Sequence, residues 1–284
     1  EVSTMQPTVR LTALDERQRA AIMEDVIMAV RQLWFSAAVI PLGRAVGVQE
    51  SGGEMIMAVD EDGPGADGLI AAAAKRGAYV VATDYSRPPD LGARLRLAGY
   101  SAVQAHRTYL LDEEAFAAAT EAGPRETRRQ GLLTMLWRRD RLPVEVHRIT
   151  EAELPHWNAV CWRAFGARTS EGVSLLDKQI AFRNMGASAR WYLATAGGRP
   201  AGTAIVFQGE EAAQVLAVGT LPSLQGRGIA TAVMKQIIRE WQAEGHGFLF
   251  LDTSPGSSAE KLYLKLGFVP AYLREVYAPG RPLP

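Results

Sequence analysis

The sequence has few cysteines, no excess of charge and no long apolar run, and each of these absences excludes a class of protein. A single cysteine among 284 residues rules out an internal disulfide and a cysteine-based zinc cluster. Basic and acidic residues number 31 each, so bulk electrostatics give no support for a nucleic-acid binder. No apolar run approaches the roughly 18 residues that cross a bilayer, and no signal peptide is visible. We therefore expect a cytoplasmic protein with no metal, no nucleic-acid partner and no membrane partner.

The most informative stretch is a glycine-rich turn between an apolar run at 215–218 and a helical pattern that starts at Ile229. The free N–H groups of a first helical turn and the helix dipole together favour an anion. Gly226 and Gly228 lack a Cβ atom, so a phosphate can approach their backbone closely. Spaced glycines of this kind, taken alone, more often simply begin a helix.

A second motif near the C-terminus changes that balance. The row Gln225-Gly226-Arg227-Gly228-Ile229-Ala230 resembles the Q/R-x-x-G-x-G/A loop of the GCN5-related N-acetyltransferase (GNAT) family. The row Ala259-x-x-Leu262-Tyr263-x-x-x-Gly267-Phe268 resembles the family signature N-x-x-A-x-x-L-Y-x-x-x-G-F, with Gly256 at the asparagine position. The two motifs follow the family order, with a predicted strand at 248–251 between them. The resemblance covers residues 144–277 well and the first half only weakly.

This resemblance implies acyl transfer from acetyl-CoA to an amine without a metal. A backbone N–H group at the end of the strand before the loop would hold the thioester carbonyl. Tyr263 would protonate the leaving thiolate, because a phenol with a pKa near 10 is protonated at neutral pH. Without the motif, Tyr263 would be interpreted as a half-buried helix tyrosine. The implied CoA-binding residues are Val218, Gly219, Thr220, Gln225, Gly226, Arg227, Gly228, Ile229, Ala230 and Thr231.

The base that deprotonates the amine is not identified by any motif. Glu210, Glu211 and Asp252 are candidates, acting directly or through water, and each also suits a surface or turn position. The four histidines belong to no motif; they are His106, His147, His156 and His246. Cys161 has no paired base and is interpreted as a core residue.

The first half repeats the order of the second, which predicts an internal duplication. Leu97-Ala98-Gly99-Tyr100 parallels Lys265-Leu266-Gly267-Phe268. The first copy is chemically degenerate, because an acidic turn at 60–68 that contains Pro64 replaces the phosphate loop and Leu95 replaces Tyr263. That turn is interpreted as a solvated loop, with a calcium loop as a weaker alternative. We expect the first copy to bind no CoA and to form a wall or lid of the acceptor site; the alternative is a purely stabilising module.

The predicted fold is α/β with a twisted mixed sheet flanked by helices in each of two GNAT-like domains. The predicted domains are a degenerate one at 1–112, a linker at 113–141 and a catalytic one at 142–284. The predicted helices span 11–33, 69–76, 91–98, 175–185, 229–245 and 257–267. A further helix is predicted after Thr150, with Glu153 as its capping-box partner, and one face of it carries Leu154, Trp157, Val160, Cys161 and Phe165. The predicted strands span 34–40, 54–59, 78–83, 101–111, 142–146, 191–195, 201–207, 215–219 and 248–251. Gly43 and Gly47, after the first of these strands, are interpreted as turn signals.

The predicted function is an acyl-CoA-dependent N-acyltransferase that moves an acetyl group directly to an amine of a small molecule. The chain would act as a monomer or a homodimer. Three alternatives stay open: a protein or peptide N-acetyltransferase, a non-catalytic acyl-CoA sensor, and an acyl-CoA decarboxylase on a GNAT fold.

Overall fold

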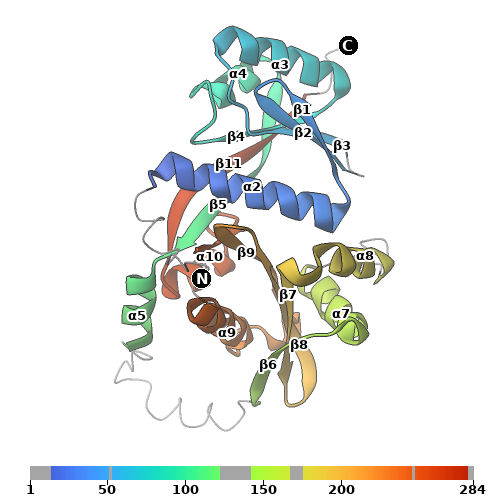
Figure 1. Cartoon of the computed structure of the whole chain (residues 1–284), viewed down its shortest axis with the longest axis vertical. Coiled ribbons are helices and arrows are strands. Elements are labelled where there is room, and N and C mark those ends of the chain that lie inside the picture. The colour runs from blue at the N-terminus through green and yellow to red at the C-terminus, as the bar shows by residue number, and fades with distance from the viewer. Residues whose placement is uncertain (1–13, 51–52, 122–141, 167–174, 245–246, 281–284) are drawn as a thin grey trace, which may run out of the picture.

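A computed structural model describes residues 14–50, 53–121, 142–166, 175–244 and 247–280 of the chain (Figure 1). The helices are α2 (Glu16–Phe35), α3 (Gly63–Arg76), α4 (Leu91–Leu97), α5 (Glu113–Glu121), α7 (Leu154–Ala164), α8 (Leu175–Met185), α9 (Ile229–Glu244) and α10 (Ser258–Lys265). The strands are β1 (Ala38–Leu42), β2 (Ala45–Glu50), β3 (Gly53–Met57), β4 (Tyr79–Thr83), β5 (Tyr100–Leu111), β6 (Val144–Arg148), β7 (Ala189–Ala196), β8 (Arg199–Gln208), β9 (Ala212–Thr220), β10 (Phe248–Thr253) and β11 (Phe268–Pro279). Short 3₁₀ turns at 151–153, 186–188 and 222–224 complete the described elements.

All of these strands join in one mixed sheet, with the order β1-β2-β3-β4-β11-β5-β10-β9-β8-β7-β6. The mixed α/β fold is thus confirmed, and the two sheets expected from the sequence are fused into one. The proposed boundaries at 112 and 142 remain a prediction. The first part of the predicted linker forms α5, and residues 122–141 lie outside the described part of the chain.

The two halves are joined by an exchange of strands. Strand β5, from the first half, lies between β10 and β11 and is antiparallel to both. Strand β11, from the end of the chain, lies between β5 and β4 of the first half. The β5–β11 ladder runs from the pair Phe268 and Leu111 to the pair Pro279 and Tyr100, so equivalent positions of the two strands are related by a local two-fold axis. This symmetry supports the predicted duplication.

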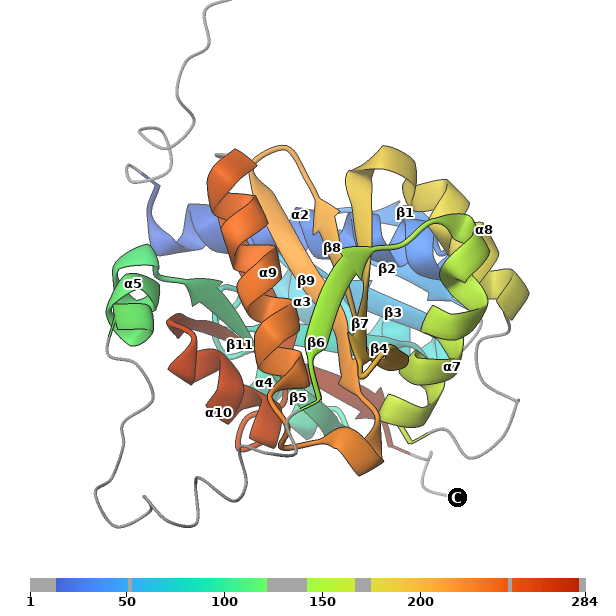
Figure 2. The ribbon, with the colours of Figure 1, turned by 90° about the horizontal axis from the view of Figure 1, so that it is seen from below.

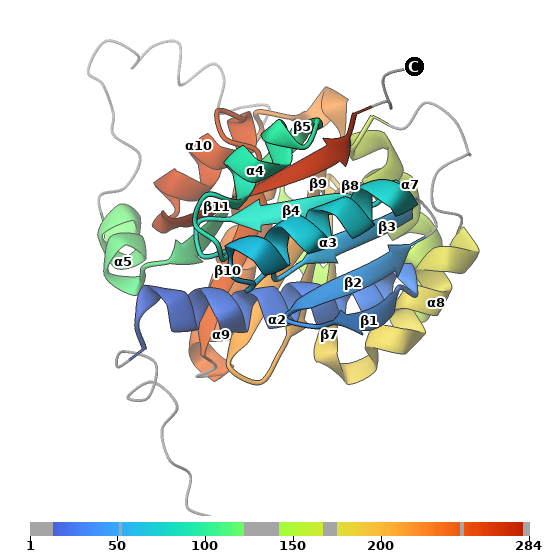
Figure 3. The same cartoon turned by 90° about the horizontal axis from the view of Figure 1, so that it is seen from above.

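The helices cover the two faces of the sheet in separate groups. Strand β10 shows the division, because Phe248 and Phe250 pack with α2, α7 and α8, whereas Leu249 and Leu251 pack with α9 and α10. Helices α3 and α4 pack on residues such as Val80 of β4, whose neighbour Val81 joins the α2 cluster. We call the two sides the α2 face and the α9 face; Figure 2 and Figure 3 show them from below and above.

Helix α2 crosses between the halves (Figure 1) and carries aromatic and charged contacts to the second half. The Trp34 ring stacks on Trp191 with centroids 5.3 Å apart and meets Trp157 edge-on at 6.3 Å. The Lys178 ammonium of α8 lies 3.6 Å from the Trp34 ring centroid. Burial lowers the pKa of Lys178 to about 8 and raises the pKa of the nearby Cys161 thiol to about 11.

Several predicted boundaries are wrong in the first half. Asp15 caps α2 with Gln18 in a capping box, and the helix extends to Phe35, so Trp34 is helical and not in a strand. The prediction missed β2, because Gly43 and Gly47 were interpreted as turn signals; only Gly43 has a positive φ. Helix α3 begins at Gly63 because Asp62 caps it, so two thirds of the predicted acidic loop is helical.

In the second half, most local predictions are confirmed. Thr150 and Glu153 form the expected capping box, and Cys161 is buried. Phe165 is an exception, since it ends α7 and leaves 62% of its surface exposed instead of lining the core. Gly245, the expected end of the long helix, lies outside the described residues.

Candidate active site

The glycine loop presents a row of free backbone N–H groups at the start of α9. Gly226 and Gly228 have φ angles of +74° and +83°, and a Cβ atom added to either would meet nothing within 4 Å. The first bond of the helix runs from the N–H of Ala232 to the carbonyl of Gly228 at 2.9 Å. The N–H groups before it have no acceptor among the described residues; they belong to Gly226, Arg227, Gly228, Ile229, Ala230 and Thr231.

This arrangement fits an anion with several oxygens. The free N–H groups and the positive end of the helix dipole lie together, and the glycines leave the backbone uncovered. Arg227 is exposed and has no ion pair with any described residue. Gln225 is also exposed, and its side-chain amide lies 3.5 Å from the carbonyl oxygen of Thr220.

Strand β9 separates from β10 just before this loop. The two strands pair in parallel only up to Val215 and Leu251, although β9 continues to Thr220. A β-bulge at the point of separation places two residues, Ala217 and Val218, opposite Ala204 of β8. Ala217 has a φ of +53°, which is strained for a residue with a side chain. The opening exposes strand edge on both β9 and β10.

The three predicted residues at the end of β9 have different surroundings. Val218 packs against the α9-face cluster. Gly219 lies tightly against the end of α7, because an added Cβ would come within 2.8 Å of the Ala164 Cβ. The Thr220 hydroxyl is buried without a hydrogen-bond partner in the described structure.

Tyr263 lies on the same face of the sheet as Val218. It belongs to α10, which Ser257 caps by accepting the N–H of Glu260 at 3.1 Å. Its ring packs edge-on against Phe268 with centroids 5.9 Å apart, and only 6% of the residue is exposed. Burial raises the pKa of Tyr263 to about 12, so its hydroxyl keeps the proton throughout the neutral range.

The three predicted carboxylate bases are not brought together. Glu210 and Glu211 precede β9, roughly 30 Å along the strand from Thr220 at about 3.3 Å per residue. Asp252 stands at the opening, at the end of β10, but its carboxylate is engaged. It accepts hydrogen bonds from the Thr108 hydroxyl at 2.7 Å and from the buried guanidinium of Arg274 at 3.2 Å.

In the corresponding turn of the first half, side-chain carboxylates accept hydrogen bonds from backbone N–H groups. The Asp62 carboxylate accepts the N–H of Gly65 at 2.7 Å, at the start of α3. The Glu61 carboxylate accepts the N–H of Arg44 at 2.9 Å. The residue equivalent to Tyr263, Leu95, is completely buried. The helix N-terminus that is open in the second half is therefore closed by a side-chain carboxylate here.

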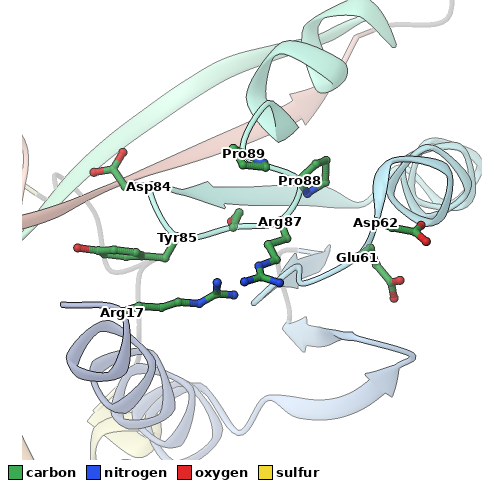
Figure 4. A pocket seen from close by; sticks show the side chains of 9 residues that line it. Arg17, Glu61, Asp62, Asp84, Tyr85, Arg87, Pro88 and Pro89 are labelled. Atoms are coloured by element: carbon green, nitrogen blue, oxygen red, sulfur yellow. The ribbon is translucent and has the colours of Figure 1, made fainter. Parts of the chain in front are cut away.

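A cavity of about 550 Å³ lies beside this acidic turn, between α2 and the segment after β4 (Figure 4). Arg17 and Arg87 both point into it and pair with Asp60 at 3.3 and 3.6 Å. The Asp84 carboxylate accepts the N–H of Leu273 at 2.8 Å. These charged groups are matched within the protein, and the cavity is remote from the glycine loop.

Comparisons with known proteins agree with this description. Residues 152–268 match the Acetyltransferase (GNAT) family. A comparison with curated proteins finds no match to the chain. No helix in the described segments is long and apolar enough to span a membrane.

Solved structures resemble the chain over nearly its whole length. A GCN5-related N-acetyltransferase from Kribbella flavida is 16% identical, with 92% of this chain and 96% of that chain covered and a TM-score of 0.59. One from Sphaerobacter thermophilus is 14% identical, with 94% and 93% covered and a TM-score of 0.58. A tandem GNAT protein from the clavulanic acid biosynthesis pathway is 14% identical, with 89% and 86% covered and a TM-score of 0.57. Residues 152–268 therefore match the acetyltransferase (GNAT) family, and the chain as a whole has the fold of these GNAT structures, one of them a tandem GNAT protein.

Proposed function

We propose that the chain transfers an acetyl group from acetyl-CoA to an amine of a small molecule, and that the second half alone binds CoA. The observation that carries this proposal is the row of free N–H groups from Gly226 to Thr231 beside the opening between β9 and β10. A pyrophosphate has the charge and the oxygen acceptors that such a row requires. The extended thiol arm of CoA would enter the opening beside it.

The chemistry follows from where charge develops. The thioester carbonyl gains negative charge as the amine attacks, and an N–H near Val218 to Thr220 would stabilise it. The departing sulfur needs a proton, and Tyr263 would supply it because its buried hydroxyl remains protonated. Tyr263 and Val218 both belong to the α9 face, so the amine would enter from the α2 face.

The surroundings of the α2 face favour a small acceptor. Ala164 and the exposed Phe165 ring flank Gly219 on one side. On the other side stand β5 and α2, both contributed by the first half. We therefore propose that the first half forms a wall of the acceptor site. Its acidic, capped helix start at Asp62 suits no second CoA.

The test is calorimetry with CoA on the intact chain. We expect one site per chain, and we expect Gly228→Ala to weaken binding at least tenfold, because its methyl group would enter the space a phosphate needs. A tenfold loss corresponds to about 1.4 kcal/mol. Gly186→Ala is the matched control: Gly186 also has a positive φ and open space, but it precedes β7 at the opposite end of the sheet.

The outcomes separate the proposals. Unchanged affinity in Gly228→Ala would exclude the glycine loop as the phosphate site, and two sites per chain would refute the degenerate first half. Thiol release from acetyl-CoA across a panel of primary amines distinguishes an enzyme from a sensor, which would bind CoA without turnover.

A further inference from the structure

His106, which the first half contributes through β5, lies level with the opening between β9 and β10. Thr253, the last residue of β10, pairs with Arg107 of β5, so His106 is one position beyond the end of β10. Continuing the β9–β10 register from Val215 and Leu251 places Thr253 level with Ala217. Because the bulge puts Ala217 and Val218 at one level, His106 is level with Gly219, with no strand between them at that point.

The distance across this gap suits a reaction. Neighbouring strands lie about 4.8 Å apart, so the backbones of β9 and β5 are roughly 10 Å apart where β10 pairs with both, and farther apart in the opening, where β9 has left β10. The chain of β10 leaves the sheet after Thr253 and turns to α10 on the α9 face. On the α2 face of this gap the thioester carbon, the attacking amine and the imidazole ring would meet.

The side chain of His106 lies on the α2 face, from which the amine would enter. Thr108, two residues along β5, donates to Asp252, which shares its face with Phe250 and Phe248. Side chains two apart on a strand point to the same side, so His106 faces α2. The side chain is partly exposed, and its ring makes no hydrogen bond to a described residue.

The charged groups around His106 are themselves paired. Arg274, its partner on β11, binds Asp252 of β10 and Glu24 of α2 at 3.2 and 2.9 Å. Arg31 of α2 binds Glu50 of β2 at 2.5 Å. Burial, together with Arg274 and Arg31, lowers the pKa of His106 against the opposing effect of Asp252, so the ring is neutral at pH 7.

We propose that His106 is the base that takes the proton from the attacking amine, directly or through one water. This inference rests on the proposed acetyl transfer. Glu210 and Glu211 are too far away, and Asp252 is held by Thr108 and Arg274. Of Glu210, Glu211, Asp252 and His106, only His106 lies at the level of the opening, faces α2 and has a ring nitrogen free to accept a proton.

The step balances with groups already present. The neutral amine nitrogen forms a bond to the carbonyl carbon, the carbon–sulfur bond breaks, and the nitrogen gives one proton to His106. Tyr263 gives its proton to the sulfur. Water returns the proton of the imidazolium to the phenolate, which restores both residues after each turnover.

The test compares His106→Asn and His106→Gln with His156→Asn, which changes an exposed histidine of α7. Acetyl-CoA and the fastest amine of the panel are the probes. We expect both His106 variants to lose roughly 100- to 1000-fold in kcat/KM at pH 7.5, within the range for general bases. We also expect the acidic limb of the pH profile to disappear, added imidazole to restore part of the rate, and CoA affinity to stay within twofold.

The outcomes distinguish this inference from the function it rests on. An intact chain that does not bind acetyl-CoA overturns both. An intact chain that transfers acetyl groups while the His106 variants keep a third of kcat/KM overturns the base alone. If the variants do not fold, proton NMR of the His106 ring in the unaltered protein tests the proposal. The His106 signal is assigned by replacing the other three histidines. An imidazole signal that does not shift when CoA and the amine are added would overturn the proposal.

Discussion

Lys178 is a buried ammonium whose removal should stabilise the protein. Lowering its pKa from 10.5 to about 8 corresponds to a cost of roughly 3 kcal/mol for the charged form, at 1.36 kcal/mol for each tenfold change in proton affinity. The Trp34 ring at 3.6 Å offsets up to about 2 kcal/mol of this through the cation–π contact. Lys178→Met keeps the apolar stem and removes the charge, so we expect it to raise the free energy of unfolding by about 1 to 3 kcal/mol at pH 7.

The sign of the pH dependence provides a sharper test. Between about pH 8 and 10.5 the unfolded chain holds the Lys178 proton more tightly than the folded chain does, so the stability of the unaltered protein rises with pH in this window. The advantage of Lys178→Met should therefore shrink from pH 8 upward and vanish near pH 10.5.

Urea unfolding followed by tryptophan fluorescence measures both effects, because Trp34, Trp157 and Trp191 surround the site. Lys261→Met, at an exposed position of α10, is the control and should change stability by less than about 0.5 kcal/mol. The reasoning fails if Lys178→Met is the less stable protein at pH 7, or if its advantage is the same at pH 7 and pH 10.5.

Two further predictions concern the acid and the strand exchange. Tyr263→Phe should lower turnover roughly 10- to 1000-fold with CoA affinity unchanged, because only the proton of the buried hydroxyl is lost; thiol release and calorimetry measure the two quantities, and full turnover would make Tyr263 structural. A fragment of residues 142–284 should not fold alone, because it lacks β5 and leaves the facing edges of β10 and β11 unpaired. Circular dichroism and thermal unfolding check this, with co-expressed residues 1–141 expected to restore folding; a fragment that unfolds cooperatively as a monomer would contradict it.

The local structural features of this protein are determined by short stretches of its sequence. The caps at Thr150 and Ser257, the glycines that start α9 and the Gly267 that ends α10 each depend on residues within a few positions of one another. Helical spacing and hydrogen-bonding side chains act over the same short range. The glycine loop and Tyr263 can therefore be identified as candidates from the amino-acid sequence alone.

The local predictions were wrong where neighbouring residues suggested another kind of element, or where a long-range contact determined which element formed. Gly47 was interpreted as a turn residue, yet it lies in β2 against Leu42 of the neighbouring strand. Trp34 was assigned to a strand by its apolar neighbours, but it ends a helix that packs on α8 and β7. Asp62 caps α3, but the acidic residues around it led to the prediction of a loop.

Only the tertiary structure decided how the two halves combine. Two alternating apolar strands, such as β5 and β11, carry no local mark of which sheet they will join, because any strand edge offers the same backbone groups. Their exchange depends on pairing between residues more than a hundred positions apart, such as His106 with Arg274. The sequence by itself identified the glycine loop and Tyr263 as candidates. The exchange of strands placed His106 at the opening, and the packing of α2 on α8 placed Lys178 beneath Trp34, through contacts that no local pattern encodes.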